Sequence, residues 1–164
     1  MRLASPHGQD TVAAMASDVA TSPPFDFRRV RDNDFDFCWP LYRDALQPLS
    51  IGLFRWDDAV QQRHVREALA DEGASVLVSD HSDAGWLHVS ESRFAIHLGH
   101  LYLMPEKRNQ GLGTSFLSWM SDRARRKNKD FTLDVMKNNR ARALYERLGF
   151  RPVRTANHTV TLQL

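Results

Sequence analysis

The sequence has a single cysteine, Cys38, among 164 residues. One cysteine can form neither an internal disulfide nor a cluster of thiolate metal ligands, and this favours a reducing compartment. The sequence also lacks a run of about 18 apolar residues, which a membrane-spanning helix needs. Asp10 and Asp18 interrupt the first twenty residues, where a secretory signal would be apolar. We therefore expect a cytoplasmic protein that does not interact with membranes.

A strong net charge is also lacking. The sequence has 22 basic and 20 acidic residues, a formal charge of +2, which is too balanced for a general polyanion binder. One cationic run stands out at residues 123–129, with five cations in seven residues. At the end of a helix, such cations compensate the negative end of the helix dipole. We therefore expect no nucleic-acid partner, and any anion site must be local.

The chain is long enough for one domain with one core. Residues 1–24 are rich in Ala, Ser, Thr, Asp, Gly and Pro and show no helical or alternating period, which is typical of a flexible N-terminal extension. Two prolines close this segment at positions 23 and 24. We predict that the folded domain spans residues 25–164.

Hydrophobic periodicity and turn residues predict the elements of this domain. Strands are expected at 25–30, 74–78, 86–89, 94–104, 131–135, near Val153 and at 159–164, with a hairpin turn at 81–85 and Pro105 ending the fourth strand. Helices are expected from an Asp32 or Asp34 cap to Pro48, at 57–70 before Gly73, at 114–127, and from Asn138 or Asn139 to Gly149. This order predicts an α/β (α+β) fold, with one mixed sheet between helices on both faces.

The segment 105–120 joins the predicted strand 94–104 to the next helix through Gly111 and Gly113. A strand that ends in a tight loop before a helix points unpaired N–H groups at one place, and the helix dipole favours negative charge there. Glycines remove the Cβ atoms that would keep a phosphate from the backbone, and Lys107 and Arg108 flank the loop. A turn without a ligand explains the glycines equally well. The segment lacks the lysine of a Walker loop and has Phe116 in place of a third glycine, so two familiar phosphate motifs are absent.

Three stretches together resemble the GCN5-related N-acetyltransferases (GNATs). Residues 108–113 resemble the signature Gln/Arg-x-x-Gly-x-Gly/Ala, residues 101–106 are similar to the strand and Pro-Glu before it, and residues 138–150 resemble the second conserved block. The resemblance covers roughly residues 25–164. It departs from the pattern at Leu103, where valine is usual, and at Gln110, where a basic residue is frequent.

The resemblance implies a fold and a co-substrate. The sheet should splay at its centre, and the loop should bind the pyrophosphate of acetyl-coenzyme A through Arg108, Asn109, Gln110, Gly111, Leu112, Gly113 and Thr114. The backbone of Leu103 and Met104 and the side-chain amide of Asn138 should bind the pantetheine arm, although Asn138 also suits a helix cap. No metal is expected.

The implied reaction is acetyl transfer from a thioester to an amine by direct attack in a ternary complex. A free amine is mostly protonated at pH 7, and deprotonating it costs about 4.6 kcal/mol without a base. His97 is our preferred base, with His100, Glu91, Glu106 or a water as alternatives, and each of these side chains also reads as an ordinary sheet or surface residue. His97 and His100 should face opposite sides of their strand unless a bulge intervenes, and they lack a nearby third ligand for a metal.

Tyr145 matches the tyrosine that protonates the leaving thiolate in this family, although its helical spacing also fits a core residue. Cys38 is expected to be a packing residue. Four aromatic residues are expected to form either an acceptor wall or core: Trp39, Tyr42, Phe54 and Trp56.

The predicted function is therefore an N-acetyltransferase, and the alternative is a non-catalytic acyl-coenzyme A sensor. The acceptor is left open among small-molecule amines, antibiotics, polyamines and the amines of proteins or peptides. A homodimer is among the assemblies open to the chain.

Overall fold

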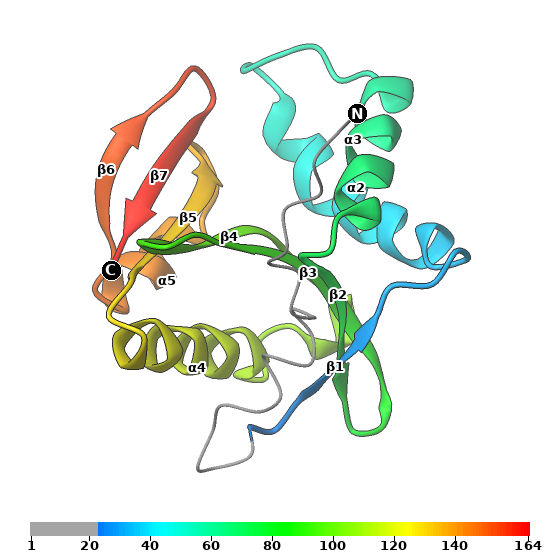
Figure 1. Cartoon of the computed structure of the whole chain (residues 1–164). Coiled ribbons are helices and arrows are strands. Elements are labelled where there is room, and N and C mark those ends of the chain that lie inside the picture. Colours follow the sequence, from blue (N-terminus) through cyan, green and yellow to red (C-terminus); the bar gives the residue numbers. More distant parts are fainter. Residues whose placement is uncertain (1–22) are drawn as a thin grey trace, which may run out of the picture.

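The computed structural model describes residues 23–164, so all but the last two residues of the predicted extension lie outside the described part. The strands of this part form one seven-stranded sheet in the order β1-β2-β3-β4-β5-β7-β6, and only the β4–β5 pair is parallel (Figure 1). The strands are β1 (Asp26–Arg29), β2 (Ala74–Ser79), β3 (Ser82–Glu91), β4 (Ala95–Leu103), β5 (Asp130–Met136), β6 (Arg151–Thr155) and β7 (Thr159–Gln163). The helices are α2 (Phe35–Ser50), α3 (Asp58–Ala70), α4 (Leu112–Arg126) and α5 (Arg142–Arg147), with a 3-10 turn, η1, at Pro105–Lys107. The prediction of one mixed sheet flanked by helices is confirmed.

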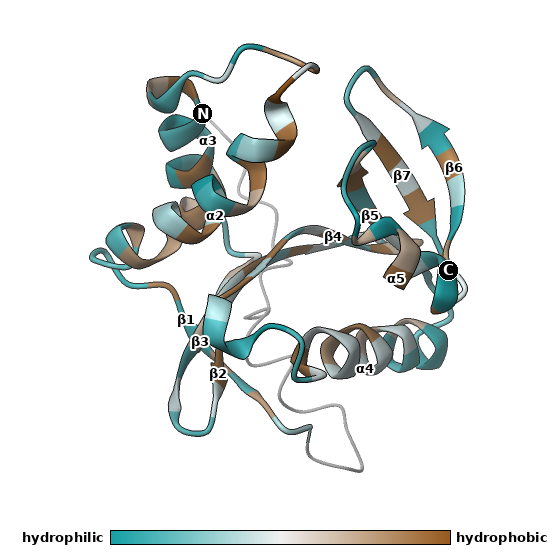
Figure 2. Cartoon of the chain, turned by 180° about the vertical axis from the view of Figure 1, so that it is seen from behind, coloured by the Kyte–Doolittle hydropathy of each residue, from teal (hydrophilic) through white to brown (hydrophobic). Residues whose placement is uncertain are grey.

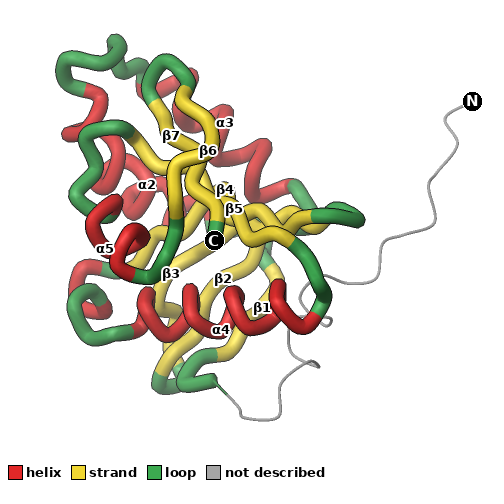
Figure 3. The backbone as a smooth tube through the Cα atoms, turned by 90° about the vertical axis from the view of Figure 1, so that its left-hand side faces the viewer, coloured by secondary structure: helices red, strands yellow, loops and turns green. Residues whose placement is uncertain are grey.

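Helices cover both faces of the sheet. Helices α2 and α3 lie on one face and α4 on the other, with the strands between them (Figures 1 and 3). Bands of hydrophobic and hydrophilic residues alternate along α2 and α3, as expected for helices with one face on the sheet (Figure 2). Leu144, Tyr145 and Leu148, in and just after α5, pack against the hydrophobic cluster on the α4 side.

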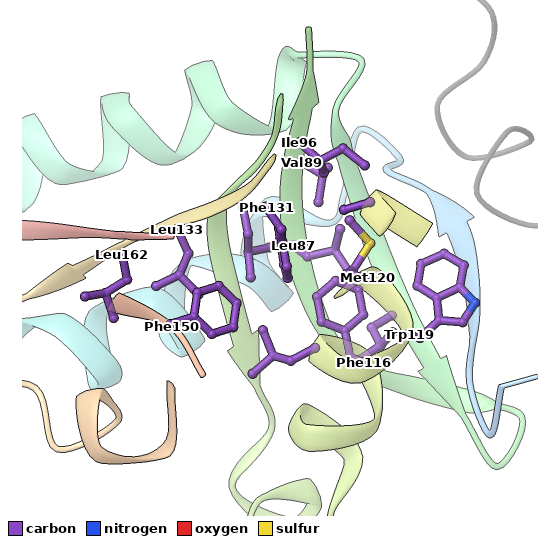
Figure 4. Packing of buried hydrophobic residues seen from close by; sticks show 14 of the residues in the cluster. Leu87, Val89, Ile96, Phe116, Trp119, Met120, Phe131, Leu133, Phe150 and Leu162 are labelled. Atoms are coloured by element: carbon purple, nitrogen blue, oxygen red, sulfur yellow. The ribbon is translucent and has the colours of Figure 1, made fainter. Parts of the chain in front are cut away.

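The core has two parts, one on each side of the sheet. The larger part lies between α4 and the strands and includes fully buried Phe116, Phe131 and Leu133 (Figure 4). Fully burying a side chain of this kind contributes about 1.5–3 kcal/mol. The smaller part lies under α2 and α3 and contains Cys38. Burial raises the pKa of the Cys38 thiol to about 12, so this residue stays a thiol and packs as predicted.

A bulge in β4 decides which way its side chains face. His88 pairs with His100 and Val89 pairs with Leu98, so Gly99 is left over on β4. A bulge shifts the alternation by one residue. His100 packs its ring on Trp86, in the core part under α2, and His97 points away from the α4-side position of its neighbour Leu98. Both histidines therefore face α2. The sequence interpretation placed them on opposite sides of the strand unless a bulge intervened, and the bulge is present.

The same region opens the sheet. β4 pairs with β5 only from Ala95 to Leu98, against Asp130 to Leu133. Beyond the bulge the two strands separate, although β3 still pairs with β4 as far as Leu103. The sheet is therefore splayed between β4 and β5, as the family resemblance implies.

The prediction for the first helix was wrong at its C-terminal end. Proline usually breaks a helix, yet α2 continues through Pro40 and Pro48 to Ser50. The buried face of the helix, which includes Trp39 and Tyr42, supplies packing that offsets the lost hydrogen bonds. Asp34 precedes the helix, but its carboxylate accepts from Arg31 N and the Arg28 guanidinium instead of capping a helix N–H.

Other boundaries moved by a few residues. The β2–β3 turn is at Asp80 and His81, both with left-handed φ, so the predicted turn at 81–85 was wrong. α4 begins at Leu112, two residues earlier than expected. α5 begins only at Arg142, because residues 137–141 form turns in which the Asn139 side chain accepts from Ala141 N.

The expectation that the whole cationic run is a solvated helix end was also wrong. Arg123 is 2% exposed and donates to the Glu91 carboxylate at 3.1 Å. Lys127 and Lys129 donate to the same carboxylate, and together these bonds lower the pKa of Glu91 to about 2. This part of the run therefore joins α4 and the start of β5 to β3, and of the five cations of the run only Arg125 and Arg126 are exposed.

Candidate active site

The glycine loop has the backbone conformation that a phosphate site needs. Gly111 precedes α4 with φ +82°, a left-handed conformation that glycine adopts without strain, and a Cβ there would meet nothing within 4 Å. The first helical hydrogen bond runs from Ser115 N to Gly111 O at 2.8 Å. The N–H groups of Leu112, Gly113 and Thr114 therefore have no acceptor within the helix. The loop presents unpaired donors at the positive end of a 15-residue helix.

A cavity of about 670 Å³ lies beside this loop. From the loop and α4 it is lined by Arg108, Asn109, Gly111, Gly113, Thr114 and Leu117. From β4 it is lined by Leu101, Tyr102 and Leu103, and from the α5 region by Ala141, Leu144 and Tyr145. The structure thus brings five of the predicted loop residues together with Leu103 and Tyr145 around one space.

The remaining predicted loop residues lie elsewhere. Gln110 donates from Nε2 to Glu106 O at 2.5 Å, and the Leu112 side chain is buried in the core. Lys107 forms an ion pair with Asp80 at 2.8 Å, so it is occupied away from the loop. At Gln110 and Leu112, only the backbone is placed to serve a ligand of the loop.

Two arginines of the cavity were missed by the sequence interpretation. Arg140 and Arg147 line it together with Arg108, and no Asp or Glu is among its described lining residues. Arg108 Nε donates to Leu103 O at 2.9 Å, whereas the guanidinium groups of Arg140 and Arg147 make no hydrogen bond or ion pair within the described part of the chain. Both stand inside the stretch 138–150 that carried the family resemblance, but periodicity gave no reason to place them at the cavity.

Beyond Leu98, the edge of β4 that has no strand neighbour faces the same space. Met104 N donates to Ala84 O at 2.9 Å, so this pair is hydrogen-bonded within the β3–β4 ladder. Because successive residues of a strand direct their backbone groups to opposite edges, Leu101 and Leu103 direct theirs toward the gap between β4 and β5. The Met104 C=O also accepts a hydrogen bond from Lys107 N. Of the two residues predicted to bind pantetheine, Leu103 directs its backbone N–H and C=O groups into the gap, and Met104 does not.

Asn138 lies outside the lining of this cavity. Its Nδ2 donates to Leu49 O at 2.9 Å and joins the loop after β5 to the end of α2. Asn138 does not cap α5 either, since the helix has Ala141 before its first residue and no side-chain cap; the neighbouring Asn139 accepts from Ala141 N in the turn that precedes the helix.

A second cavity of about 270 Å³ adjoins the first. Leu101, Tyr102 and Tyr145 line both. The second cavity is also lined by Leu46, Leu98, Gly99, His100, Leu133, Asp134, Val135, Met136, Asn139 and Thr159. It therefore lies at the splayed part of the sheet, between α2 and the strands β4, β5 and β7.

Tyr145 stands at the junction of the two cavities. Its ring packs edge-on against Phe150 at 6.1 Å, so the predicted core contact exists, yet the residue is only partly buried. Burial raises the pKa of its hydroxyl, which therefore stays protonated at neutral pH. No hydrogen bond to this hydroxyl occurs among the described residues, so it is free to donate to a ligand.

The two histidines of β4 have different environments. His100 lines the second cavity, and burial lowers the pKa of its imidazole to about 4, so the ring is neutral at pH 7. His97 lies just outside the lining. Its Nδ1 is 2.9 Å from Thr132 Oγ1, and its Nε2 is 3.5 Å from Asp134 Oδ2. His97 therefore reaches the cavity only through Asp134, a residue that the sequence interpretation did not consider.

The other candidate bases lie away from both cavities. Glu91 is bound by three cations, and Glu106 is exposed in the 3-10 turn η1. The four predicted wall aromatics form a row of stacked or tilted rings on the α2 side, and none lines either cavity. Trp39 and Tyr42 are buried and belong to the core.

Residues 47–160 match the acetyltransferase (GNAT) domain family, and this is more than half of the chain. The chain belongs to the GNAT acetyltransferase family. GNAT proteins with solved structures share its fold, although none of those below exceeds 20% identity. The PaiA N-acetyltransferase of Thermoplasma acidophilum, solved with coenzyme A, is 16% identical with a TM-score of 0.63 over 85% of this chain and 97% of that one.

Two further structures illustrate the range of relatives. An acetyltransferase of Thermus thermophilus is 17% identical with a TM-score of 0.64, over 85% of this chain and 96% of that one. The ribosomal-protein-S18-alanine N-acetyltransferase of Escherichia coli is 19% identical with a TM-score of 0.58, over 85% of this chain and 92% of that one. No curated protein sequence matches the chain. Within the described residues, none of the helices is long and apolar enough to cross a membrane.

Proposed function

We propose that this GNAT protein transfers the acetyl group of acetyl-coenzyme A to an amine, by direct attack with both substrates bound. The observation that carries the proposal is the junction of the two cavities at Tyr145. One cavity adjoins the glycine loop, and the other opens toward α2 and β7. Two substrates bound from the two sides would meet at the tyrosine.

The larger cavity fits the donor. The pyrophosphate would accept hydrogen bonds from the N–H groups at the start of α4, where Gly111 and Gly113 keep the backbone accessible. The pantetheine arm would pair with the unpaired edge of β4 at Leu101 and Leu103. The amides of the loop can bind one anionic group. The three arginines that line this cavity suit a further anionic group of the donor. We assign Arg140 and Arg147 to the other anionic group of the donor, the 3′-phosphate of coenzyme A.

The smaller cavity fits the acceptor and the proton transfers. As the amine nitrogen bonds to the acetyl carbon and the carbon–sulfur bond breaks, the nitrogen must lose a proton and the sulfur must gain one. Tyr145 would donate its hydroxyl proton to the departing thiolate. The amine proton would pass to His97 together with Asp134, which faces the cavity.

The arrangement of His97 suits this role. Its Nδ1–H can donate to Thr132 Oγ1, which leaves Nε2 as the acceptor on the side of Asp134. A proton taken up at Nε2 would face the Asp134 carboxylate at 3.5 Å.

Two measurements test the proposal. Acetyl-coenzyme A should raise the Tm of the protein, and free thiol should appear when an amine is added, together with an equal amount of N-acetylated amine. Stabilisation without thiol release by any amine would replace the enzyme with a non-catalytic acyl-coenzyme A sensor. Absence of stabilisation would overturn the donor assignment itself.

A further inference from the structure

We infer that the acceptor is a compact, positively charged amine with an apolar body and without a carboxylate beside the amine. This inference rests on the proposed function and narrows it to one class of acceptors. The observations behind it are the composition of the smaller cavity, which has one anionic side chain, and the contacts between residues that lie next to its walls in sequence.

Asp134 is the anionic group. Among the described residues that line the smaller cavity, it is the only charged side chain, because His100 is neutral at pH 7. A lone carboxylate in a partly enclosed space attracts an ammonium group and repels a second carboxylate. An amino acid would bring its own carboxylate into this space and find no cation there.

The carboxylate is held in place but not saturated. Asp134 Oδ1 accepts from Thr161 Oγ1 at 2.6 Å, and Oδ2 lies 3.5 Å from His97 Nε2. A carboxylate offers about four lone-pair positions, so both oxygens can accept further hydrogen bonds. The side chain is 35% exposed, which leaves room for an ammonium group.

The rest of the lining is mainly apolar. Leu46, Leu133 and Met136 contribute alkyl surface, and the rings of Tyr102 and Tyr145 contribute aromatic surface. Such surfaces bind a hydrocarbon body through burial and do not reward a second charge.

Contacts between the walls limit the size of the acceptor. Phe54, in the link after α2, packs on His158 of the β6–β7 turn with ring centroids 5.2 Å apart. Asn138 also bonds to Leu49 O between the same two sides of the molecule. Leu46 and Thr159 of the lining lie close in sequence to these bridging residues. The volume of about 270 Å³ holds about nine water-sized groups, which suits a small amine better than a peptide chain.

The experiment compares amines with the matching amino acids. Initial rates of thiol release from acetyl-coenzyme A are measured with 2-phenylethylamine against phenylalanine, and with tyramine against tyrosine. A tetrapeptide with a free N-terminus and an aliphatic amine complete the panel. We expect kcat/KM to be at least tenfold higher for each amine than for its amino acid, and higher than for the peptide.

The variant Asp134→Asn tests the residue. Asparagine keeps the shape and can still accept from Thr161, so the fold should persist. We expect the amine-to-amino-acid ratio to fall at least fivefold, a change that loss of a general structural or catalytic role alone would not produce. Asp130→Asn, on the same strand but outside the cavity lining, should leave the ratio unchanged.

The outcomes separate this inference from the function on which it rests. Thiol release with equal rates for amines and amino acids, or a faster rate for the peptide, would overturn the acceptor class and leave the acetyltransferase proposal standing. An unchanged ratio in Asp134→Asn would also overturn the role of Asp134. Binding of acetyl-coenzyme A without thiol release from any amine, amino acid or peptide would overturn both the acceptor class and the acetyltransferase proposal.

Discussion

The two cavities that meet at Tyr145 have opposite charge. The larger one, of about 670 Å³, is lined by three arginines and by no acid among the described residues. The smaller one, of about 270 Å³, is lined by one carboxylate and by no arginine or lysine from the same part of the chain. An anionic donor and a cationic acceptor would each be attracted to one cavity and repelled from the other. The difference indicates that charge alone can sort the two substrates to the two sides of one tyrosine.

The cavities also differ in how the chain builds them. The larger one depends on backbone features close together in sequence, namely a left-handed glycine, a helix start and the free edge of β4. The smaller one depends on residues from five separate elements, including Leu46, His100, Asp134, Tyr145 and Thr159. A local motif can reveal the first kind of site, and only the folded structure reveals the second.

The largest expected effect is the loss of the donor cavity. Gly111→Glu places a negative side chain at the phosphate site, and we expect acetyl-coenzyme A to bind at least 100-fold more weakly by calorimetry. Gly52→Glu is the matched control, since Gly52 has φ +78°, also has no atom near its missing Cβ, and lines neither cavity. Each variant should lose about 1 kcal/mol of stability from backbone strain, with binding kept only in the control. Affinity within threefold of wild type in Gly111→Glu would refute the donor site.

The next effect concerns Tyr145, one of the three residues that line both cavities. Tyr145→Phe removes the proposed acid, and we expect kcat to fall about 100-fold while KM for acetyl-coenzyme A changes less than threefold. Tyr42→Phe is the control, because the Tyr42 hydroxyl donates to Gln61 at 2.6 Å in the core and lines neither cavity. That variant should lose about 1 kcal/mol of stability and keep its kcat. An unchanged kcat in Tyr145→Phe would remove Tyr145 from the chemistry.

A third effect concerns His100, which lines the smaller cavity and is uncharged at neutral pH. The pKa of His100 is about 4 in the folded protein against 6.5 in the unfolded chain, because burial disfavours the charged ring. Between these values the unfolded chain binds the proton and the folded protein does not, so acid favours unfolding. This contribution is present above pH 6.5 and is lost as the pH falls toward 4. His100 should therefore cost about 2 kcal/mol of stability between pH 7 and pH 5.

Urea unfolding at the two pH values checks this. His100→Phe removes the titrating group, so the difference between pH 7 and pH 5 should shrink by about the same amount. His81→Asn, at an exposed position in the β2–β3 turn, is the control for removing a histidine outside the cavity. An equal pH dependence in His100→Phe and wild type would show that His100 is not the group responsible.

The smallest expected effect refines the charge of the donor cavity. Arg140→Gln and Arg147→Gln should each raise KM for acetyl-coenzyme A about five- to tenfold, because each removes a cation from the proposed 3′-phosphate contact. The same variants should change KM for acetyl-dephospho-coenzyme A less than twofold. Arg142→Gln is the control, since Arg142 pairs with Glu146 at 3.3 Å and does not line the cavity. Equal losses with both donors would place the two arginines elsewhere.

The parts of the fold with strong local signals were predicted well. The helix predicted to start at Asp57 starts one residue later and is capped by the Asp57 carboxylate, and Gly149, with φ +101°, follows the last helix as predicted. The predictions that were wrong concerned features that depend on tertiary packing. α2 continues through two prolines because its buried face packs under the sheet, and Arg123 is buried because Glu91 comes from a distant strand.

The site was predictable only as far as its motif extends. Five of the seven loop residues and Tyr145 line the larger cavity, and their roles toward acetyl-coenzyme A stay predictions. The bulge at Gly99 had one local sign, a glycine inside a strand pattern, and this bulge turns His97 and His100 to the same side. Asp134 carried no sign at all, because an aspartate that alternates with apolar residues on a strand reads as a solvent-facing position.

The meeting of the two cavities is tested most directly by initial rates measured over a matrix of acetyl-coenzyme A and amine concentrations. If both substrates are bound together at Tyr145, double-reciprocal lines should intersect to the left of the ordinate. Parallel lines would show that the acetyl group is first passed to the protein, and this would contradict direct transfer between the two cavities.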